Sequence, residues 1–213
     1  MKTYFLIILA VALMFVGNAY SGTVATFSDP ALNASTPLFN VNSITKTVTG
    51  GWDDTKTGLN LQVVRTGNTF SNAYFTMTPL TMTAGSLAYD TTGSGTIRFF
   101  KDGDPTSATP ILQIDFDSLS VTYGAIGGNN VFNSSGVKFS GSEIGSTIFS
   151  EEVFSFSFAN LKALDSGSPQ NGYSATASFT SSAVPEPATL ALLGIGAAAM
   201  FRKRSCLKAF VNN

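Results

Sequence analysis

Apolar and polar residues alternate at period two through most of the chain, and this pattern constrains the fold more than any other feature. The clearest examples are residues 59–64, 112–117 and 154–159, in which apolar side chains recur at every second position. Successive side chains of a β-strand point to opposite faces, so this spacing is typical of strands with one buried face. No window between residues 22 and 183 has convincing helical periodicity. The sequence therefore predicts an all-β domain.

Gly, Asn, Asp, Ser and Pro divide this pattern into short pieces, as turns do between antiparallel strands. The strands predicted in this way cover residues 23–28, 44–49, 59–64, 70–78, 85–90, 96–101, 112–117, 119–124, 137–140, 154–159 and 173–180. The chain has 18 phenylalanines against one tryptophan and six tyrosines, so we expect phenylalanine to fill most of the core. Short strands at this spacing favour an antiparallel β-sandwich or a jelly-roll-like fold.

The amino terminus has the pattern of a Sec signal peptide. Lys2 precedes an apolar segment, residues 5–16, and small residues follow at Ala19 and Ser21. Small residues just before the cleavage site are what a signal peptidase requires. We therefore predict a helical signal peptide over residues 1–21, cleaved after Ser21 or after Ala19. An uncleaved anchor is the alternative.

The opposite end of the chain carries a glutamate bracketed by prolines. Pro185, Glu186 and Pro187 should be stiff and extended, because each proline fixes its own φ and biases the preceding residue away from helix. Residues 180–183 are predicted to form a short flexible linker between the last strand and this motif. Such a linker would let an enzyme reach the motif without unfolding the sheet.

A membrane-seeking segment follows the motif. Residues 188–201 carry no charge and are predicted to form a single transmembrane helix. At about 1.5 Å per residue they span roughly 21 Å, so the bilayer would thin, or the flanking cations would snorkel, to accommodate them. Arg202, Lys203 and Arg204 mark the cytoplasmic side. The alternative is a buried helix of a soluble domain, which the basic cluster and the preceding prolines disfavour.

The motif, the apolar segment and the basic cluster resemble, in order and spacing, the PEP-CTERM sorting signal of Gram-negative bacteria. This signal is also labelled the C-terminal domain of ice-binding proteins. The resemblance covers residues 184–204 of a signal that we place at 183–208. It implies that an exosortase recognises the motif, cleaves near it and passes the protein to the cell surface. The tail at residues 205–213 departs from the family, whose members usually end soon after the basic cluster.

These boundaries leave residues 22–182 as one exported domain with a restricted chemistry. The chain has no histidine, and its only cysteine, Cys206, lies beyond the basic cluster, so the domain can have no disulfide. Residues 22–184 contain seven Lys/Arg and twelve Asp/Glu, which gives a net charge of −5. A mildly acidic domain without a basic patch argues against nucleic-acid binding.

Four carboxylates are the candidates for a metal site. Asp102 and Asp104 flank a turn glycine after the strand at 96–101, and Asp115 and Asp117 share one face of the following strand. If the two strands form a hairpin, the four side chains could gather around a calcium ion. The plainer interpretation is that the first pair forms a turn and the second pair faces solvent. The same acids raise a glycosidase alternative, which acid pairs of this kind support weakly.

Trp52 is the candidate for binding a sugar. It follows two glycines and precedes two aspartates, so a loop position would expose its ring for stacking, with help from Tyr74, Tyr89 and Tyr123. The plainer interpretation is that Trp52 caps one end of the core.

These features together predict an exported surface protein that is not an enzyme and needs no cofactor beyond the calcium considered above. Sec would export it, residues 188–201 would anchor it transiently in the inner membrane, and processing would deliver it to the cell surface or extracellular matrix. The resemblance implies a structural or adhesive role in exopolysaccharide, in a biofilm or floc, with an exosortase as partner. The alternative is a carbohydrate-binding module assisted by calcium.

Overall fold

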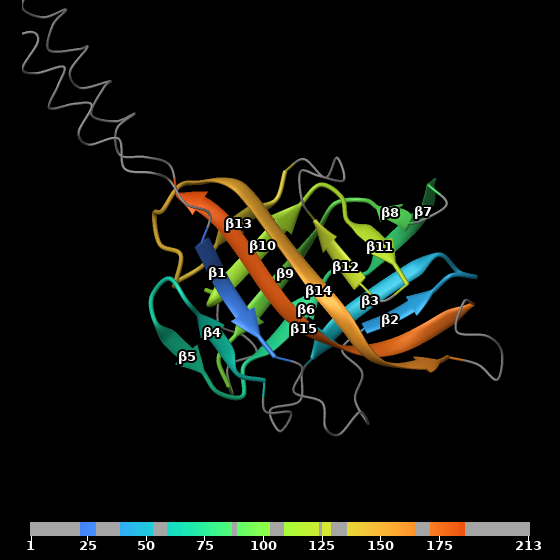
Figure 1. The fold of residues 1–213 in the computed structure, drawn as a ribbon, viewed down its shortest axis with the longest axis horizontal. Coiled ribbons are helices and arrows are strands. Elements are labelled where there is room, and N and C mark those ends of the chain that lie inside the picture. The colour runs from blue at the N-terminus through green and yellow to red at the C-terminus, as the bar shows by residue number, and fades with distance from the viewer. Residues whose placement is uncertain are drawn as a thin grey trace, which may run out of the picture. The chain divides into compact units, whose positions relative to one another are not determined.

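The computed structural model describes residues 22–28, 39–52, 59–86, 89–102, 109–123, 125–128, 136–164 and 171–185, which form fifteen β-strands (Figure 1). In chain order they are β1 (Gly22–Phe27), β2 (Phe39–Asn42), β3 (Thr47–Trp52), β4 (Leu61–Val63), β5 (Asn68–Phe70), β6 (Tyr74–Met77), β7 (Leu80–Ser86), β8 (Tyr89–Thr92), β9 (Gly95–Phe100), β10 (Leu112–Phe116), β11 (Ser120–Thr122), β12 (Ala125–Gly128), β13 (Lys138–Ser140), β14 (Phe149–Ala163) and β15 (Gly172–Pro185). No described residue is helical, so the predicted all-β class is confirmed.

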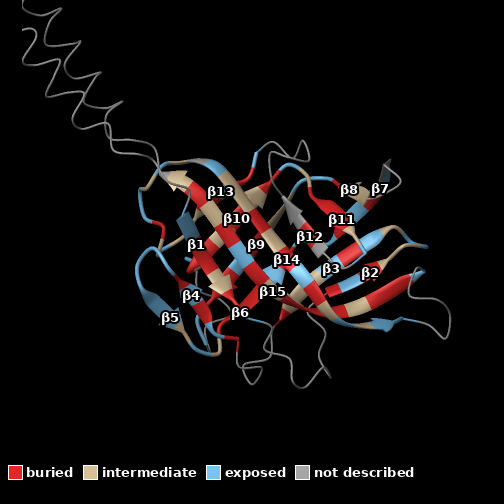
Figure 2. Ribbon diagram, in the orientation of Figure 1, coloured by how far each residue is buried: buried red, intermediate tan, exposed pale blue. Residues whose placement is uncertain are grey.

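The strands bury every second side chain, as the sequence pattern predicts (Figure 2). In β10, Leu112, Ile114 and Phe116 are buried, whereas Gln113 and Asp115 between them are partly exposed. β15 likewise buries its odd-numbered positions from 173 to 183. Each large apolar side chain removed from water contributes about 1.5–3 kcal/mol, which makes one-sided burial the main force that assembles such strands.

The strands pair in antiparallel fashion along one path, β13-β10-β9-β6-β3-β7-β8-β11-β12-β14-β15-β1-β4-β5. β2 lies off this path and pairs with both β15 and β3. The path ends at β13 and β5, so the sheet is not closed. β3 joins the two parts of the sheet. Its first residues, Thr47 and Val48, pair with β7, whereas its last residues, Gly51 and Trp52, pair with β6. The strands expected to form a sandwich or jelly roll are therefore joined into a single hydrogen-bonded sheet.

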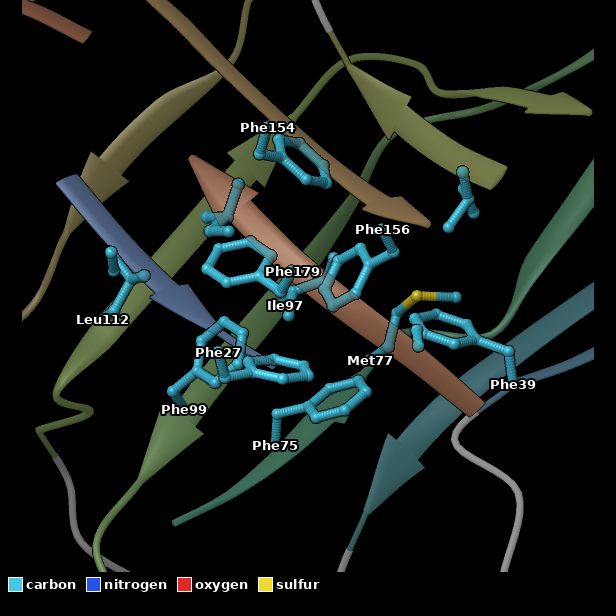
Figure 3. Packing of buried hydrophobic residues seen from close by; sticks show 14 of the residues in the cluster. Phe27, Phe39, Phe75, Met77, Ile97, Phe99, Leu112, Phe154, Phe156 and Phe179 are labelled. Carbon is cyan, nitrogen blue, oxygen red and sulfur yellow. The ribbon is translucent and has the colours of Figure 1, made fainter. Parts of the chain in front are cut away.

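Phenylalanine fills the core, as its abundance predicts (Figure 3). Phe156 is fully buried at the centre of the cluster, and its ring centroid lies 4.9 Å from that of Phe39 and 4.9 Å from that of Phe179. Phe27 and Phe75 pack against the same ring at 6.1 and 5.7 Å. Stacked, tilted and edge-to-face rings at such distances add about 0.5–1.5 kcal/mol per pair beyond the burial of area.

Candidate functional site

The last strand of the sheet runs into the predicted sorting motif. β15 ends at Pro185, and its final residues pair with the beginning of β1. Gly22 lies opposite Ala183, and Thr23 lies opposite Ser182. The residue that follows the predicted signal-peptide cleavage site is therefore a direct neighbour of the segment that precedes the motif.

Ser181 fastens this end of the sheet. The register of the β1–β15 pair shifts between Thr23 and Ala25. The buried hydroxyl of Ser181 accepts a hydrogen bond from the Ala25 amide at 3.1 Å and donates one to the Ala25 carbonyl at 3.0 Å. A bulge interrupts the hydrogen-bond ladder, and this side chain supplies the partners. Residues 180–183 thus belong to a fixed strand, and the prediction of a flexible linker is wrong.

The other parts of the two predicted signals lie outside the described residues. These parts are the signal peptide at 1–21, Glu186 and Pro187 of the motif, the apolar segment 188–201 and the basic cluster 202–204. Within the ranges that the structure describes, no helix has the length and apolar character needed to cross a membrane.

The candidate calcium ligands sit at different ends of one hairpin. β9 and β10 pair as expected, with Asp115 opposite Thr96. Asp102 comes six residues after Thr96, just beyond the other end of β9. At about 3.3 Å per residue, some 20 Å of strand separates Asp102 from Asp115. Asp104 lies outside the described residues.

Asp115 has protein partners of its own. Its carboxylate accepts hydrogen bonds from the Thr96 hydroxyl at 2.8 Å and from the Gln113 side-chain amide at 2.8 Å. Asp117, two residues further along, is exposed. In the described part of the chain, no group of three or more His, Cys, Asp or Glu side chains is arranged to hold a metal ion.

Trp52 is a core residue. It is the last residue of β3, its side chain is 4% exposed, and it belongs to the same hydrophobic cluster as Val48. A sugar ring therefore finds no open face of Trp52 on which to stack. Of the tyrosines grouped with it, Tyr74 is buried against Phe100, whereas Tyr123 is 64% exposed.

A pocket of about 400 Å³ opens beside Tyr123, near the first residues of β15. Its buried apolar side chains are Val41, Met82, Val121 and Tyr173. Its more exposed side chains are Ser43, Asp90, Thr122 and Tyr123. They come from β2, β7, β8, β11, β15 and adjoining turns, so the pairing of distant strands builds the cavity. We call it the tyrosine pocket.

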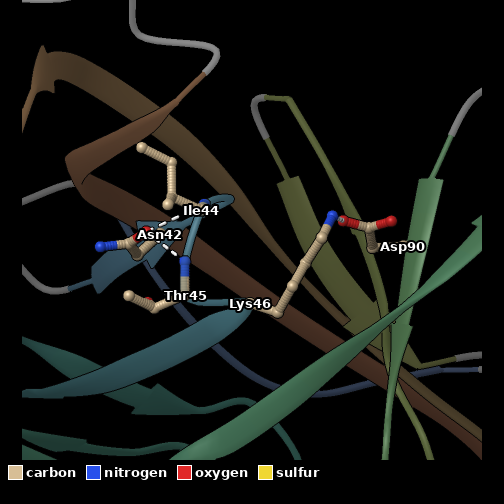
Figure 4. A network of polar contacts seen from close by, with 5 residues as sticks. All are labelled: Asn42, Ile44, Thr45, Lys46 and Asp90. Carbon is tan, nitrogen blue, oxygen red and sulfur yellow. Dashed lines mark hydrogen bonds and ion pairs between the residues drawn. The ribbon is translucent and has the colours of Figure 1, made fainter.

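A polar network includes Asp90 of the tyrosine pocket and the turn that follows β2 (Figure 4). In the turn between β2 and β3, the Asn42 side-chain oxygen accepts hydrogen bonds from the amides of Ile44 at 3.0 Å and Thr45 at 2.9 Å. The next residue, Lys46, has a positive φ of 56°, and its ammonium lies 3.2 Å from the carboxylate of Asp90. Both charged side chains are partly exposed, so the pair contributes less than about 1 kcal/mol and mainly sets geometry.

Two tyrosines form the other side of the pocket. The Tyr123 ring stands edge-to-face against the Tyr173 ring, with centroids 5.4 Å apart. The Tyr173 hydroxyl donates a hydrogen bond to the Thr122 carbonyl at 3.0 Å, and its ring also packs against Phe158 at 5.9 Å. Tyr173 is thus fixed from two directions, and it gives the exposed ring of Tyr123 a rigid support.

Sequence reasoning identified Tyr123 but missed the charged pair. Lys46 and Asp90 are 44 positions apart, and they meet only because β3, β7 and β8 pair in that order. Only Asn42 gave a local sequence signal for this part of the pocket. An asparagine side chain often accepts a hydrogen bond from the amide two residues later, which forms an Asx turn. That signal predicts the turn but not the residue that the turn presents.

A half-buried carboxylate lies away from the tyrosine pocket, on β14. Glu152 accepts a hydrogen bond from the Phe139 amide of β13 at 2.6 Å. Burial raises the pKa of Glu152 above its usual value, against the opposing effects of this hydrogen bond and of the nearby Lys138 ammonium. Among the described strands β13 is an end of the sheet path, so Glu152 partners an amide of an edge strand.

The sheet and its tail together define an exported protein with a C-terminal sorting signal. The signal is a PEP-CTERM protein-sorting motif, whose family model matches residues 183–205. This confirms the resemblance, and the motif implies exosortase processing, export and sorting to the cell surface. Neither the curated proteins nor the solved structures contain a match to the chain.

Proposed function

We propose that the chain is a non-enzymatic structural or adhesive protein of the bacterial surface matrix. Sec exports it, residues 188–201 hold it transiently in the inner membrane, and an exosortase processes it near Pro185 and passes it outward. The sheet domain then contacts exopolysaccharide in a biofilm or floc. The sorting motif supports this route of export. The surface of the sheet supports the structural or adhesive role in the matrix.

The observation that carries this role is a set of uncharged polar rows on the outward side of the strands. One row crosses β5, β4, β1 and β15 through the paired residues Thr69, Gln62, Thr26 and Thr180. A second row crosses β2, β3 and β7 through Asn42, Thr47 and Thr81. Neighbouring strands lie about 4.8 Å apart, so each row spaces its hydroxyl and amide groups regularly. Such rows suit hydrogen bonding to a hydrated, neutral polymer.

The experiment is deletion of the gene in the source bacterium, followed by complementation with the full chain. We expect deletion to reduce the mass and cohesion of the surface matrix, and the wild-type chain to restore both. A chain with Glu186→Gln should be exported but stay with the membrane fraction, because the motif loses its carboxylate. Glu151→Gln, at an exposed position of the sheet, is the matched control and should restore the matrix. An unchanged matrix after deletion would contradict the proposal.

A further inference from the structure

The tyrosine pocket lies at the beginning of β15, whereas the pairing with the first residues of β1 lies towards the end of this strand. β15 begins at Gly172, beside the pocket residue Tyr173, and ends at Pro185 (Figure 1). The twelve residue-to-residue steps from Tyr173 to Pro185 correspond to about 40 Å of strand at about 3.3 Å per residue. The beginning of β1 pairs with the end of β15, far from the pocket. The pocket therefore belongs to the end of the sheet that is remote from the Gly22–Ala183 pair.

Exposed apolar side chains gather at this remote end. Ile44 follows the pocket residue Ser43 and is 68% exposed, and Tyr123 in the pocket wall is 64% exposed. Leu164, 40% exposed, follows β14 and donates its amide to the carbonyl of Gly172 at 3.1 Å. Among the described residues, these three are the majority of the five large hydrophobic side chains that are exposed. Apolar surface that gathers beside a concave site indicates a binding function.

The chemistry of the tyrosine pocket combines one open aromatic face with paired charges. Tyr123 offers an exposed ring that is held in place by Tyr173. Asp90 lines the pocket and is paired with Lys46, so the two charges neutralise each other and offer both donors and acceptors, and Ser43 of the lining adds a hydroxyl. A pyranose has the complementary form, since its C–H groups make apolar faces and its hydroxyls need both donors and acceptors. The zero net charge of the pair favours a neutral sugar over a uronic acid.

We propose that the tyrosine pocket binds a neutral hexose unit of a polysaccharide. The sugar lies against the ring of Tyr123, and its hydroxyls contact Asp90, Lys46 and Ser43. This inference rests on the proposed matrix function and assigns the part of the sheet domain that contacts the polysaccharide. It also moves the sugar site from Trp52, which is buried, to the pocket beside the first residues of β15.

The test uses the full-length chain purified in detergent micelles, with cellohexaose, maltohexaose and a hexagalacturonate as probes. Titration calorimetry and saturation-transfer NMR should detect binding of at least one neutral hexaose at about 10 mM or below. Tyr123→Ala should weaken this binding about tenfold or more, because it removes the ring. Tyr123→Phe keeps the ring and should bind within about twofold of the wild type. Asp90→Asn should also weaken binding, and the hexagalacturonate should bind less well than the neutral probe.

Ile148→Ala is the matched control, because Ile148 is 67% exposed but lies outside the tyrosine pocket. Thermal unfolding should show that each variant is folded, since Tyr123 is mostly exposed. The proposal is overturned if the wild type binds no hexaose or if Tyr123→Ala binds as the wild type does. It is also overturned if Ile148→Ala loses as much hexaose affinity as Tyr123→Ala. Loss of matrix on gene deletion, with no hexaose bound, would overturn the pocket but keep the matrix function. If deletion leaves the matrix unchanged but the hexaose binds in a Tyr123-dependent way, the matrix function is overturned and the pocket is kept.

Discussion

Gly22, the first residue of β1, lies directly opposite Ala183 of β15, two residues before Pro185. The first and last strands of the sheet are therefore neighbours, and the new amino terminus left by signal peptidase after Ser21 would be held beside Ala183. A processing enzyme meets the motif at the end of a paired strand. The stability of the β1–β15 pair should therefore influence both folding and processing.

Ser181→Ala should destabilise the domain by about 1–3 kcal/mol. The substitution removes the hydroxyl that bonds both the Ala25 amide and the Ala25 carbonyl, and it leaves these buried polar groups without that hydrogen bond. Urea unfolding of the full chain in detergent measures the loss. Ser182→Ala, at a half-exposed neighbour, is the control and should stay within about 0.5 kcal/mol of the wild type. Equal stability of the two variants would show that the Ser181 hydroxyl does not fasten the bulge.

Insertion of Gly-Ser-Gly-Ser between Ala183 and Val184 should accelerate processing. Residues 180–183 are paired with β1, so the enzyme has no flexible segment before Pro185. The insertion supplies one and leaves the β1–β15 pair intact. Pulse-chase electrophoresis in cells that contain the cognate exosortase gives the rate of cleavage.

The same insertion after Gly67, in the turn between β4 and β5, controls for the length of the chain. It should leave the rate unchanged, because this turn is remote in sequence from the motif. A wild-type rate for the insertion at Ala183 would mean that the paired strand does not limit access to the motif.

The sequence predicted the features that depend on neighbouring residues. The alternation in 112–117 and 154–159 is a local property, and it located β10 and the central part of β14. The sequence did not predict β12, because Ala125–Gly128 is rich in glycine, which is typical of a turn. It is a strand because β11 and β14 supply hydrogen-bond partners on both sides, which is a tertiary effect that overrides propensity.

Trp52 shows how such an error arises. Gly50 and Gly51 suggested a loop. In the structure Val48, Gly50 and Trp52 are alternate residues of β3 and lie on the same face of the strand, where Val48 and Trp52 are buried. The glycine at position 50 has a packing reason, because a Cβ there would lie 2.7 Å from the ring of Phe39. The pocket was unpredictable for a different reason. Its charged pair joins β8 to a turn 44 positions earlier, and only the order of the strands brings the two together.

Phe156→Ala should cost about 3–5 kcal/mol of the free energy of unfolding. The ring is fully buried and lies within 5.0 Å of the Phe39 and Phe179 rings, so its removal leaves a cavity that rigid neighbours cannot fill. Chemical denaturation monitored by circular dichroism measures the change. Phe70→Ala is the control, since Phe70 is only partly buried at the margin of the cluster, and its loss should be clearly smaller. Similar losses for both variants would show that Phe156 is not the centre of the core.

Glu152→Gln should stabilise the protein at neutral pH and do so less in acid. Burial raises the pKa of Glu152 in the folded state above its value in the unfolded chain. Between those two pKa values the folded state binds more protons, so stability falls as the pH rises through that window. At neutral pH the ionised carboxylate therefore carries a desolvation cost, and below the usual glutamate pKa it carries none. Glutamine keeps an oxygen that can accept the hydrogen bond from the Phe139 amide, and it has no charge to desolvate.

The measurement is the difference in Tm between Glu152→Gln and the wild type at about pH 7 and about pH 3.5, which bracket the usual glutamate pKa. We expect this difference to be positive at pH 7 and to shrink towards pH 3.5. Glu151→Gln removes a carboxylate from the exposed neighbouring position and controls for the change in net charge. A difference that grows on acidification would mean that the hydrogen bond from Phe139 and the charge of Lys138 outweigh burial. Glu152 would then stabilise the edge at β13 in its ionised form.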